Sequence, residues 1–283
     1  MTQNETLPGH GTDARAPAAY FLRDGDSFVP TWIAQGPWGE SISGHVIGGI
    51  LGWAVERAGG DPELQPARLT VDLPRPTALE PVRVETIVQR DGRRIRLVDA
   101  ALIQGANVVA RASALFLRRG QQPPDEVWSS SAIMPPLPTE PGPIPEQLAM
   151  FIQTYGWGTT SGTPGIGKAE WQTEAGPKFA WVRERRLLID DEPLTPFTRA
   201  AMAGDVTSSL THWGTGGLQF INADFTVTLS RLPEGPYIGL ASLTHHSHSG
   251  VATGTATILD HRGAIGSGMA TALVHPGFRS PFQ

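Results

Sequence analysis

The strongest constraint on the fold of this chain is an order of elements that occurs twice. A Gly- and Ala-rich stretch with apolar residues at helical spacing precedes four strand-like stretches in residues 41–119, and the same order returns in residues 197–275. Val82, Val84, Thr86 and Val88 recur at every second position and alternate with Arg83 and Glu85, as in half-buried strands. Antiparallel hairpins following one another in sequence indicate an α+β class and fit a parallel, doubly wound sheet poorly.

A proline-rich segment separates the two copies. Residues 121–145 contain eight prolines, a density that prevents helices and interior strands. We therefore predict a disordered leader at residues 1–18, a first unit at 19–120, an extended linker at 121–145 and a second unit at 146–283.

The predicted helices carry unusually small side chains. Gly44, Gly48 and Gly52 lie four residues apart in the first helix, and Ala200 to Gly204 form a similar run in the second. A helix with such a surface packs closely against a sheet. A long central helix wrapped by an antiparallel sheet, occurring twice, is a double hotdog. We therefore expect two antiparallel sheets, each wrapped around one long central helix.

Composition narrows the classes of function. The chain has 283 residues, a net charge of −5 and no cysteine. Nucleic acid is excluded as the main partner because phosphate binding needs a basic surface, and cysteine-based metal or nucleophile chemistry is excluded as well. No apolar run approaches the roughly 18 residues that span a bilayer, and the polar N-terminus lacks the apolar core of a secretory signal. We expect a cytoplasmic protein.

With both halves in place, the chain resembles the acyl-CoA thioesterase II family of double-hotdog proteins from about Trp32 to Val274. The stretch "SGHVIGGIL" is similar to the start of the family's first helix, and "FAWVRERRLLIDDEPLTPFTRAAMAGDVTSSL" is similar to its strand, acidic turn and second helix. Asp205 matches the aspartate of that second helix. The family's Thr and Gln, which hold the attacking water with the aspartate, fall on Asn222 and Ala270 here.

The resemblance implies an acyl-CoA substrate and a homodimer. Thioester hydrolysis needs a base that activates water and a positive dipole for the developing oxyanion. Asp205 is the predicted base and Asn222 the residue that orients the water. The oxyanion donors are predicted among the backbone amides of Gly44, His45 and Val46, at the positive end of the first helix. This chemistry requires no metal, no redox cofactor and no covalent intermediate.

Further candidates surround these residues. His45 lies near the thioester, or pairs with Glu40, or is a partly exposed residue at a helix start with a local acceptor. Glu40 itself could simply be a favourable charge at the helix N-terminus. Thr271 or Ser267 could replace the missing Gln around the water.

Aromatic residues could line an acyl tunnel or simply belong to the core, a choice that the sequence leaves open for Trp32, Trp38, Trp53, Phe220 and Phe225.

Two alternative functions stay open. Asp205 could be a solvated or hydrogen-bonded helix residue in a double hotdog that binds acyl-CoA or another lipid without turnover. A hydratase or dehydratase would need a histidine facing Asp205. His246 and His248 share one face of a strand, but a third metal ligand is missing at a sensible spacing, so we predict no metal site.

Overall fold

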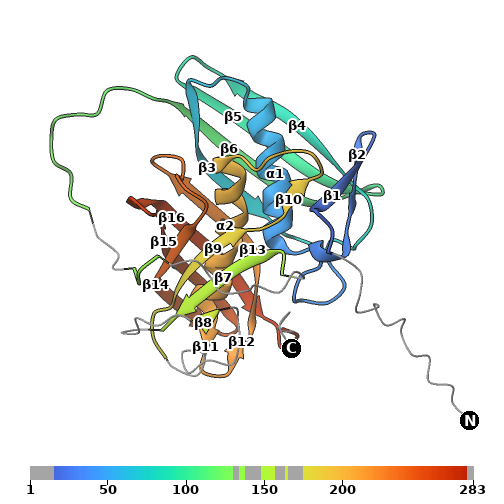
Figure 1. Cartoon of the computed structure of the whole chain (residues 1–283), viewed down its shortest axis with the longest axis vertical. Coiled ribbons are helices and arrows are strands. Elements are labelled where there is room, and N and C mark those ends of the chain that lie inside the picture. The colour runs from blue at the N-terminus through green and yellow to red at the C-terminus, as the bar shows by residue number, and fades with distance from the viewer. Residues whose placement is uncertain (1–15, 130–133, 138–147, 157–162, 165–174, 279–283) are drawn as a thin grey trace, which may run out of the picture.

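The computed structural model describes residues 16–129, 134–137, 148–156, 163–164 and 175–278. Two α-helices, α1 (Gly44–Gly59) and α2 (Pro196–His212), lie side by side in the middle of the molecule (Figure 1). A short 3-10 helix, η1 (Trp32–Ala34), comes shortly before α1.

The strands follow the predicted order in both halves. Those of the first half are β1 (Ala19–Asp24), β2 (Ser27–Pro30), β3 (Leu64–Asp72), β4 (Val82–Asp91), β5 (Ile95–Gln104) and β6 (Asn107–Arg118). Those of the second half are β7 (Met150–Tyr155), β8 (Thr163–Pro164), β9 (Phe179–Glu184), β10 (Leu187–Ile189), β11 (Trp213–Gly214), β12 (Gly217–Leu218), β13 (Phe220–Leu229), β14 (Ile238–His248), β15 (Val251–Asp260) and β16 (Gly263–Val274). Residues 244–250, "THHSHSG", lie mostly in β14, because the turn after this strand is confined to residues 249–250.

The four long strands after each helix repeat with a constant offset. They begin at residues 64, 82, 95 and 107 in the first half and at 220, 238, 251 and 263 in the second, a difference of 156 each time. Both sets lie in the same spatial order, β3-β6-β5-β4 and β13-β16-β15-β14. The described residues thus contain the internal duplication that the sequence predicts.

The prediction of two separate sheets is not confirmed. Fourteen strands form one sheet in the order β10-β1-β2-β4-β5-β6-β3-β13-β16-β15-β14-β9-β7-β8, and β11 pairs with β12 alone. The halves join because β3 and β13 pair in antiparallel fashion, with Thr70 opposite Thr226 and 3.0 Å between their hydroxyl oxygens. At the other edge of the first half, β10 crosses over and pairs with β1 in parallel.

The small residues bring the helices against each other as well as against the sheet. A Cβ atom at Gly48 would lie 3.1 Å from the carbonyl oxygen of Ala201, and one at Gly52 would lie 2.7 Å from the Cβ of Ala201. Farther along, the carboxylate of Glu56 meets Thr195 at the start of α2. The helices therefore run in opposite directions, so the N-terminus of α1 lies beside the C-terminal half of α2.

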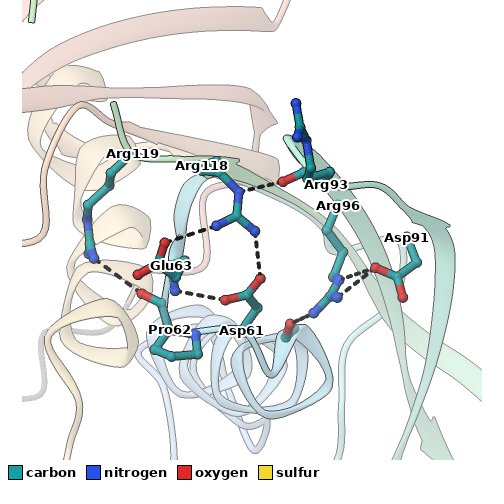
Figure 2. A network of polar contacts seen from close by, with 9 residues as sticks. Asp61, Pro62, Glu63, Asp91, Arg93, Arg96, Arg118 and Arg119 are labelled. Carbon is teal, nitrogen blue, oxygen red and sulfur yellow. Dashed lines mark hydrogen bonds and ion pairs between the residues drawn. The ribbon is translucent and has the colours of Figure 1, made fainter. Parts of the chain in front are cut away.

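The C-terminal end of α1 is fixed by an arginine network (Figure 2). The Arg96 guanidinium donates to the carbonyl of Gly59 and to Asp91, while Arg118 bridges Asp61 and Glu63 at 3.1 and 3.0 Å. Cations beside the last carbonyls of a helix satisfy unpaired acceptors and favour its dipole. The C-terminal end of α1 is thus held by this network, and the candidate site described below lies at the N-terminal end.

The domain boundaries stay predictions. Residues 1–15 of the predicted leader lie outside the described residues, and β1 begins at Ala19. Within the predicted linker, residues 121–129 and 134–137 form neither helix nor strand, as expected for a proline-rich stretch. In the part of the chain that the structure describes, no helix is both long and apolar enough to traverse a bilayer.

Candidate active site

A cavity of about 310 Å³ opens at the N-terminus of α1. Most of its walls are apolar and come from both halves of the chain, with η1, the start of β7, α2 and β13 all contributing. The apolar lining consists of Trp32, Ile33, Pro37, Trp38, Leu148, Ala149, Met150, Ile152, Val206, Leu218, Phe220 and Phe278. The polar lining consists of Tyr20, Gln35, Ser43, His45, Asp205, Ser208, Ser209 and Asn222. A mostly apolar cavity with a few convergent polar groups is the usual form of a ligand site.

Asp205 lies in the wall of this cavity, where α2 meets the first turn of α1. A Cβ atom at Gly44 would lie 2.4 Å from the Oδ1 atom of Asp205, so only glycine leaves room for this carboxylate. Burial raises the pKa of Asp205 to about 6, although hydrogen bonds from the Asn222 side chain and the His45 backbone lower it in part. A carboxylate with a pKa near neutrality suits general base catalysis.

Asn222 reaches Asp205 because of a bulge in β13. Its Nδ2 atom donates to Oδ1 of Asp205 at 2.9 Å. Phe225 faces the helices, so strict alternation would turn Asn222, three residues earlier, outward. The register shift between Asn222 and Asp224 inserts one residue and returns the amide to the inner face. The structure thus brings together the two predicted catalytic residues.

The three predicted oxyanion donors are not equivalent. The Val46 N–H donates to the Ser43 carbonyl at 3.0 Å, and the His45 N–H interacts with the Asp205 carboxylate. The Gly44 N–H has no acceptor among the described residues. Gly44 lines the cavity at the N-terminus of α1, so among these three residues it is the one whose backbone N–H is available as a donor there.

A chain of polar side chains extends from the cavity into the interior. The Ser43 hydroxyl lies 2.7 Å from Nδ1 of His45, the Nε2 atom of His45 lies 3.3 Å from the Tyr20 hydroxyl, and Tyr20 donates to Glu184 at 2.8 Å. Burial lowers the pKa of His45 to about 4 and raises that of Glu184 to about 8. Sequence reasoning missed Ser43, Tyr20 and Glu184, because Tyr20 and Glu184 are 164 positions apart.

The remaining predicted residues lie elsewhere. Glu40 is exposed, does not line the cavity and makes no hydrogen bond or ion pair within the described part of the chain, so its predicted pairing with His45 is wrong. Thr271 binds Asp224 through its N–H and its hydroxyl, at 2.7 and 2.6 Å, away from Asp205. Ser267 is exposed, and Ala270 is buried in the core. Neither Thr271 nor Ser267 therefore replaces the family's Gln at the cavity.

Three of the five predicted tunnel aromatics line the cavity, namely Trp32, Trp38 and Phe220. Trp38 makes edge-to-face contacts with Phe278 and His275 at the same end of the molecule, with ring centroids 5.3 Å apart in each case. Trp53 and Phe225 pack in the core instead.

A second cavity, of about 400 Å³, lies at the C-terminal end of α2. His212 faces His245 there, with 3.0 Å between their Nδ1 atoms, and it does not face Asp205. His212 is therefore not the histidine that a hydratase would need opposite Asp205; the histidine in the cavity wall beside Asp205 is His45. No group of three or more candidate metal ligands occurs among the residues that the structure describes.

Comparison with known proteins finds one matching family model and several similar folds. Residues 34–117 match the model of the acyl-CoA thioesterase N-terminal domain, and no curated protein sequence matches the chain. Among solved structures, a tesB protein of Mycobacterium avium subsp. paratuberculosis is similar (16% identity, 90% of this chain and 96% of that chain covered, TM-score 0.63). So are the acyl-CoA thioesterase II TesB2 of Mycobacterium marinum (18%, 83% and 91%, 0.57) and a hot dog fold protein of unknown function from Alicyclobacillus acidocaldarius (18%, 91% and 96%, 0.62).

Proposed function

We propose that this thioester hydrolase, whose residues 34–117 form an acyl-CoA thioesterase domain, hydrolyses fatty-acyl thioesters of coenzyme A with water activated by Asp205. In this proposal Asn222 orients the carboxylate and its water. The backbone N–H of Gly44 stabilises the negative charge on the substrate oxygen.

One observation carries the proposal. The carboxylate of Asp205, the amide of Asn222 and the free N–H of α1 converge on one apolar cavity. A base and an oxyanion donor on opposite sides of a substrate carbonyl are the two requirements of thioester hydrolysis.

The electrostatics support the role of Asp205. Near pH 7 a carboxyl group with a pKa of about 6 is mostly ionised, yet it is more basic than an exposed aspartate. It can therefore take a proton from water, and the Asn222 amide, which cannot titrate, keeps it in place. In this proposal the chemistry uses the two side chains, the backbone N–H of Gly44 and water.

The lining of the cavity supports a fatty-acyl substrate. Trp32, Trp38, Phe220 and Phe278 supply large apolar surfaces, which stabilise an alkyl chain by about 25 cal/mol for each Å² removed from water. The second candidate function is binding of acyl-CoA without turnover, and it rests on Ala270, which provides no polar group where the family has Gln.

A hydrolysis panel separates the two functions. Wild type and Asp205→Asn are assayed with acyl-CoAs of graded chain length, following release of the free thiol. We expect turnover by wild type on some chain lengths and a loss of about a hundredfold or more in the variant. Equal rates would contradict the role of Asp205, and binding without turnover on every thioester would favour the binding protein. Sedimentation of the same sample tests the homodimer, which is still a prediction.

A further inference from the structure

Phe220 lies at the boundary between two cavities. It lines the cavity of about 310 Å³ beside Asp205, from here on the first cavity, and also the second cavity, of about 400 Å³. No other described residue lines both. On α2 the lining passes from one cavity to the other between consecutive residues, because Ser209 belongs to the first cavity and Leu210 to the second. The two spaces are therefore neighbours, and one aromatic ring stands between them.

The ring of Phe220 is held by its neighbours on the side of the second cavity. Its centroid lies 5.8 Å from that of His212 and 6.0 Å from that of His245, distances at which aromatic rings attract each other. The backbone is held as well, because the carbonyl of the preceding residue accepts a hydrogen bond from the His275 N–H at 2.7 Å. These contacts keep the Phe220 ring in place as a wall between the cavities.

The distance from Asp205 to this wall limits the length of a chain in the first cavity. Asn222, which holds the Asp205 carboxylate, follows Phe220 by two residues of β13, and two residues of a strand span about 7 Å. Along α2, the seven residues from Asp205 to His212 correspond to about 10 Å. Each carbon of an extended alkyl chain advances by about 1.3 Å, because C–C bonds are about 1.5 Å long. A chain that runs from Asp205 along α2 therefore meets Phe220 after about six to eight carbons.

The second cavity offers an apolar continuation beyond that wall. Its lining includes Leu210, Trp213 and Leu243, and no aspartate, glutamate, lysine or arginine is among the described residues that line it. Burial lowers the pKa of His212 to about 4 and also lowers the pKa of His245, so both rings are neutral near pH 7. Uncharged and largely apolar walls suit an alkyl chain and disfavour a charged group.

We infer that Phe220 sets the upper limit on the acyl chain of the substrate. The first cavity accepts chains of about eight carbons or fewer, and the second cavity becomes part of the acyl site only when the ring is removed. This inference rests on the proposed function, because it names the acyl chains whose thioesters Asp205 and its water would cleave. A longer chain has to displace a ring that packs against two histidines, whereas a chain that fits gains about fourfold in binding for each methylene buried.

The test is the dependence of kcat/KM on chain length in Phe220→Ala. Wild type and the variant are assayed with saturated acyl-CoAs of graded length. We expect kcat/KM of wild type to decline beyond about eight carbons. Phe220→Ala is expected to raise kcat/KM for the longer chains at least about tenfold, because the added space buries further methylenes. Trp32→Ala removes an aromatic ring that lines only the first cavity, so it is expected to lower kcat/KM at all lengths without moving the optimum.

A second substitution tests whether the gain comes from the second cavity. Leu243 lines that cavity and is 51% exposed, so a larger side chain can be placed there without overpacking the core. Phe220→Ala combined with Leu243→Trp is expected to lose the gain for long chains and to keep the short-chain kcat/KM of Phe220→Ala. A general loosening of the fold by Phe220→Ala would not be reversed by Leu243→Trp.

Two outcomes would overturn the inference. One is wild type hydrolysing long chains as well as short ones, and the other is Phe220→Ala keeping the wild-type profile. In both cases the proposed function stands, because wild type still hydrolyses thioesters. Failure of the proposed function appears differently, as no turnover of any acyl-CoA by wild type. Calorimetric titration with the same acyl-CoAs then tests the wall directly, and a dissociation constant with the same chain-length dependence in wild type and Phe220→Ala would contradict it. Circular dichroism of each variant checks that the fold is intact.

Discussion

A carboxylate of one helix lies at the N-terminus of the other helix in two places. Asp205 of α2 lies against the first turn of α1, and Glu56 of α1 meets Thr195 at the start of α2 with 2.6 Å between oxygens. The antiparallel helices and the duplicated strands make the two places counterparts. Burial raises the pKa of the carboxyl group in both.

The two places differ in their caps and in their free space. Thr195 caps α2 by accepting from the N–H of Thr198 at 3.0 Å, whereas Ser43 leaves the N-terminus of α1 uncapped. The cavity beside Asp205 measures about 310 Å³, and the one near the start of α2, lined by Trp53 and Glu192, measures about 10 Å³. A carboxylate at a helix N-terminus is thus common to both places, and an uncapped helix with space for a substrate is particular to one.

The largest expected effect compares the two carboxylates directly. Asp205→Asn is expected to lower kcat by about a hundredfold to ten thousandfold, because the base for water is lost. Glu56→Gln removes a charge at the capped N-terminus of α2 and is expected to leave kcat within about twofold. Steady-state kinetics on one acyl-CoA measure both. A comparable loss of kcat in the two variants would mean that both carboxyl groups act through the packing of the helices rather than through base catalysis.

The next prediction tests the space that Gly44 leaves for Asp205 at the N-terminus of α1. In Gly44→Ala the new Cβ atom would lie 2.4 Å from Oδ1 of Asp205, so the carboxylate must move. A misplacement of about 1 Å at a reacting group costs about a hundredfold in rate, and we expect a loss of kcat of this order.

Gly49→Ala is the matched control for this helix. Its Cβ atom would meet the Met202 side chain, at 2.7 Å, and not Asp205. We expect Gly49→Ala to change the free energy of unfolding and to leave kcat per folded molecule nearly unchanged. Equal kcat losses in the two alanine variants would contradict the specific role of Gly44.

The pH profile of kcat/KM gives a smaller and more specific effect. Asp205 must be ionised to act as a base, so kcat/KM, which reports the free enzyme, is expected to fall as the pH decreases through about 6. The Asn222 hydrogen bond lowers this pKa, so Asn222→Ala is expected to move the acid limb to higher pH. Glu56→Gln is expected to leave the limb in place, and an unmoved limb in Asn222→Ala would show that another group titrates.

Sequence patterns predicted the repeat because helix and strand periodicity are local properties. The candidate roles of Asp205 and Asn222 came from the family resemblance, and Asn222 reaches Asp205 only through a bulge that no alternation pattern indicates. Sequence patterns did not predict that β3 and β13 join the halves into one sheet, because edge pairing depends on how the halves meet. The contacts from His45 through Tyr20 to Glu184 escaped for the same reason, since these residues come from α1, β1 and β9 and meet only in the folded protein.

The smallest expected effect concerns Thr195, the residue that caps α2. Thr195→Ala removes the acceptor for the Thr198 N–H and the donor to Glu56, and it is expected to lower the free energy of unfolding by about 1–2 kcal/mol. Thr195→Ser retains both hydrogen bonds and is expected to cost only a few tenths of that amount, as measured by urea denaturation. Neither variant is expected to change kcat, because the cavity at this end of α2 measures only about 10 Å³. A loss of activity in Thr195→Ala with stability intact would show that the N-terminus of α2 takes part in function. The contrast between the capped helix α2 and the uncapped helix α1 would then no longer explain why Asp205, and not Glu56, is the proposed base.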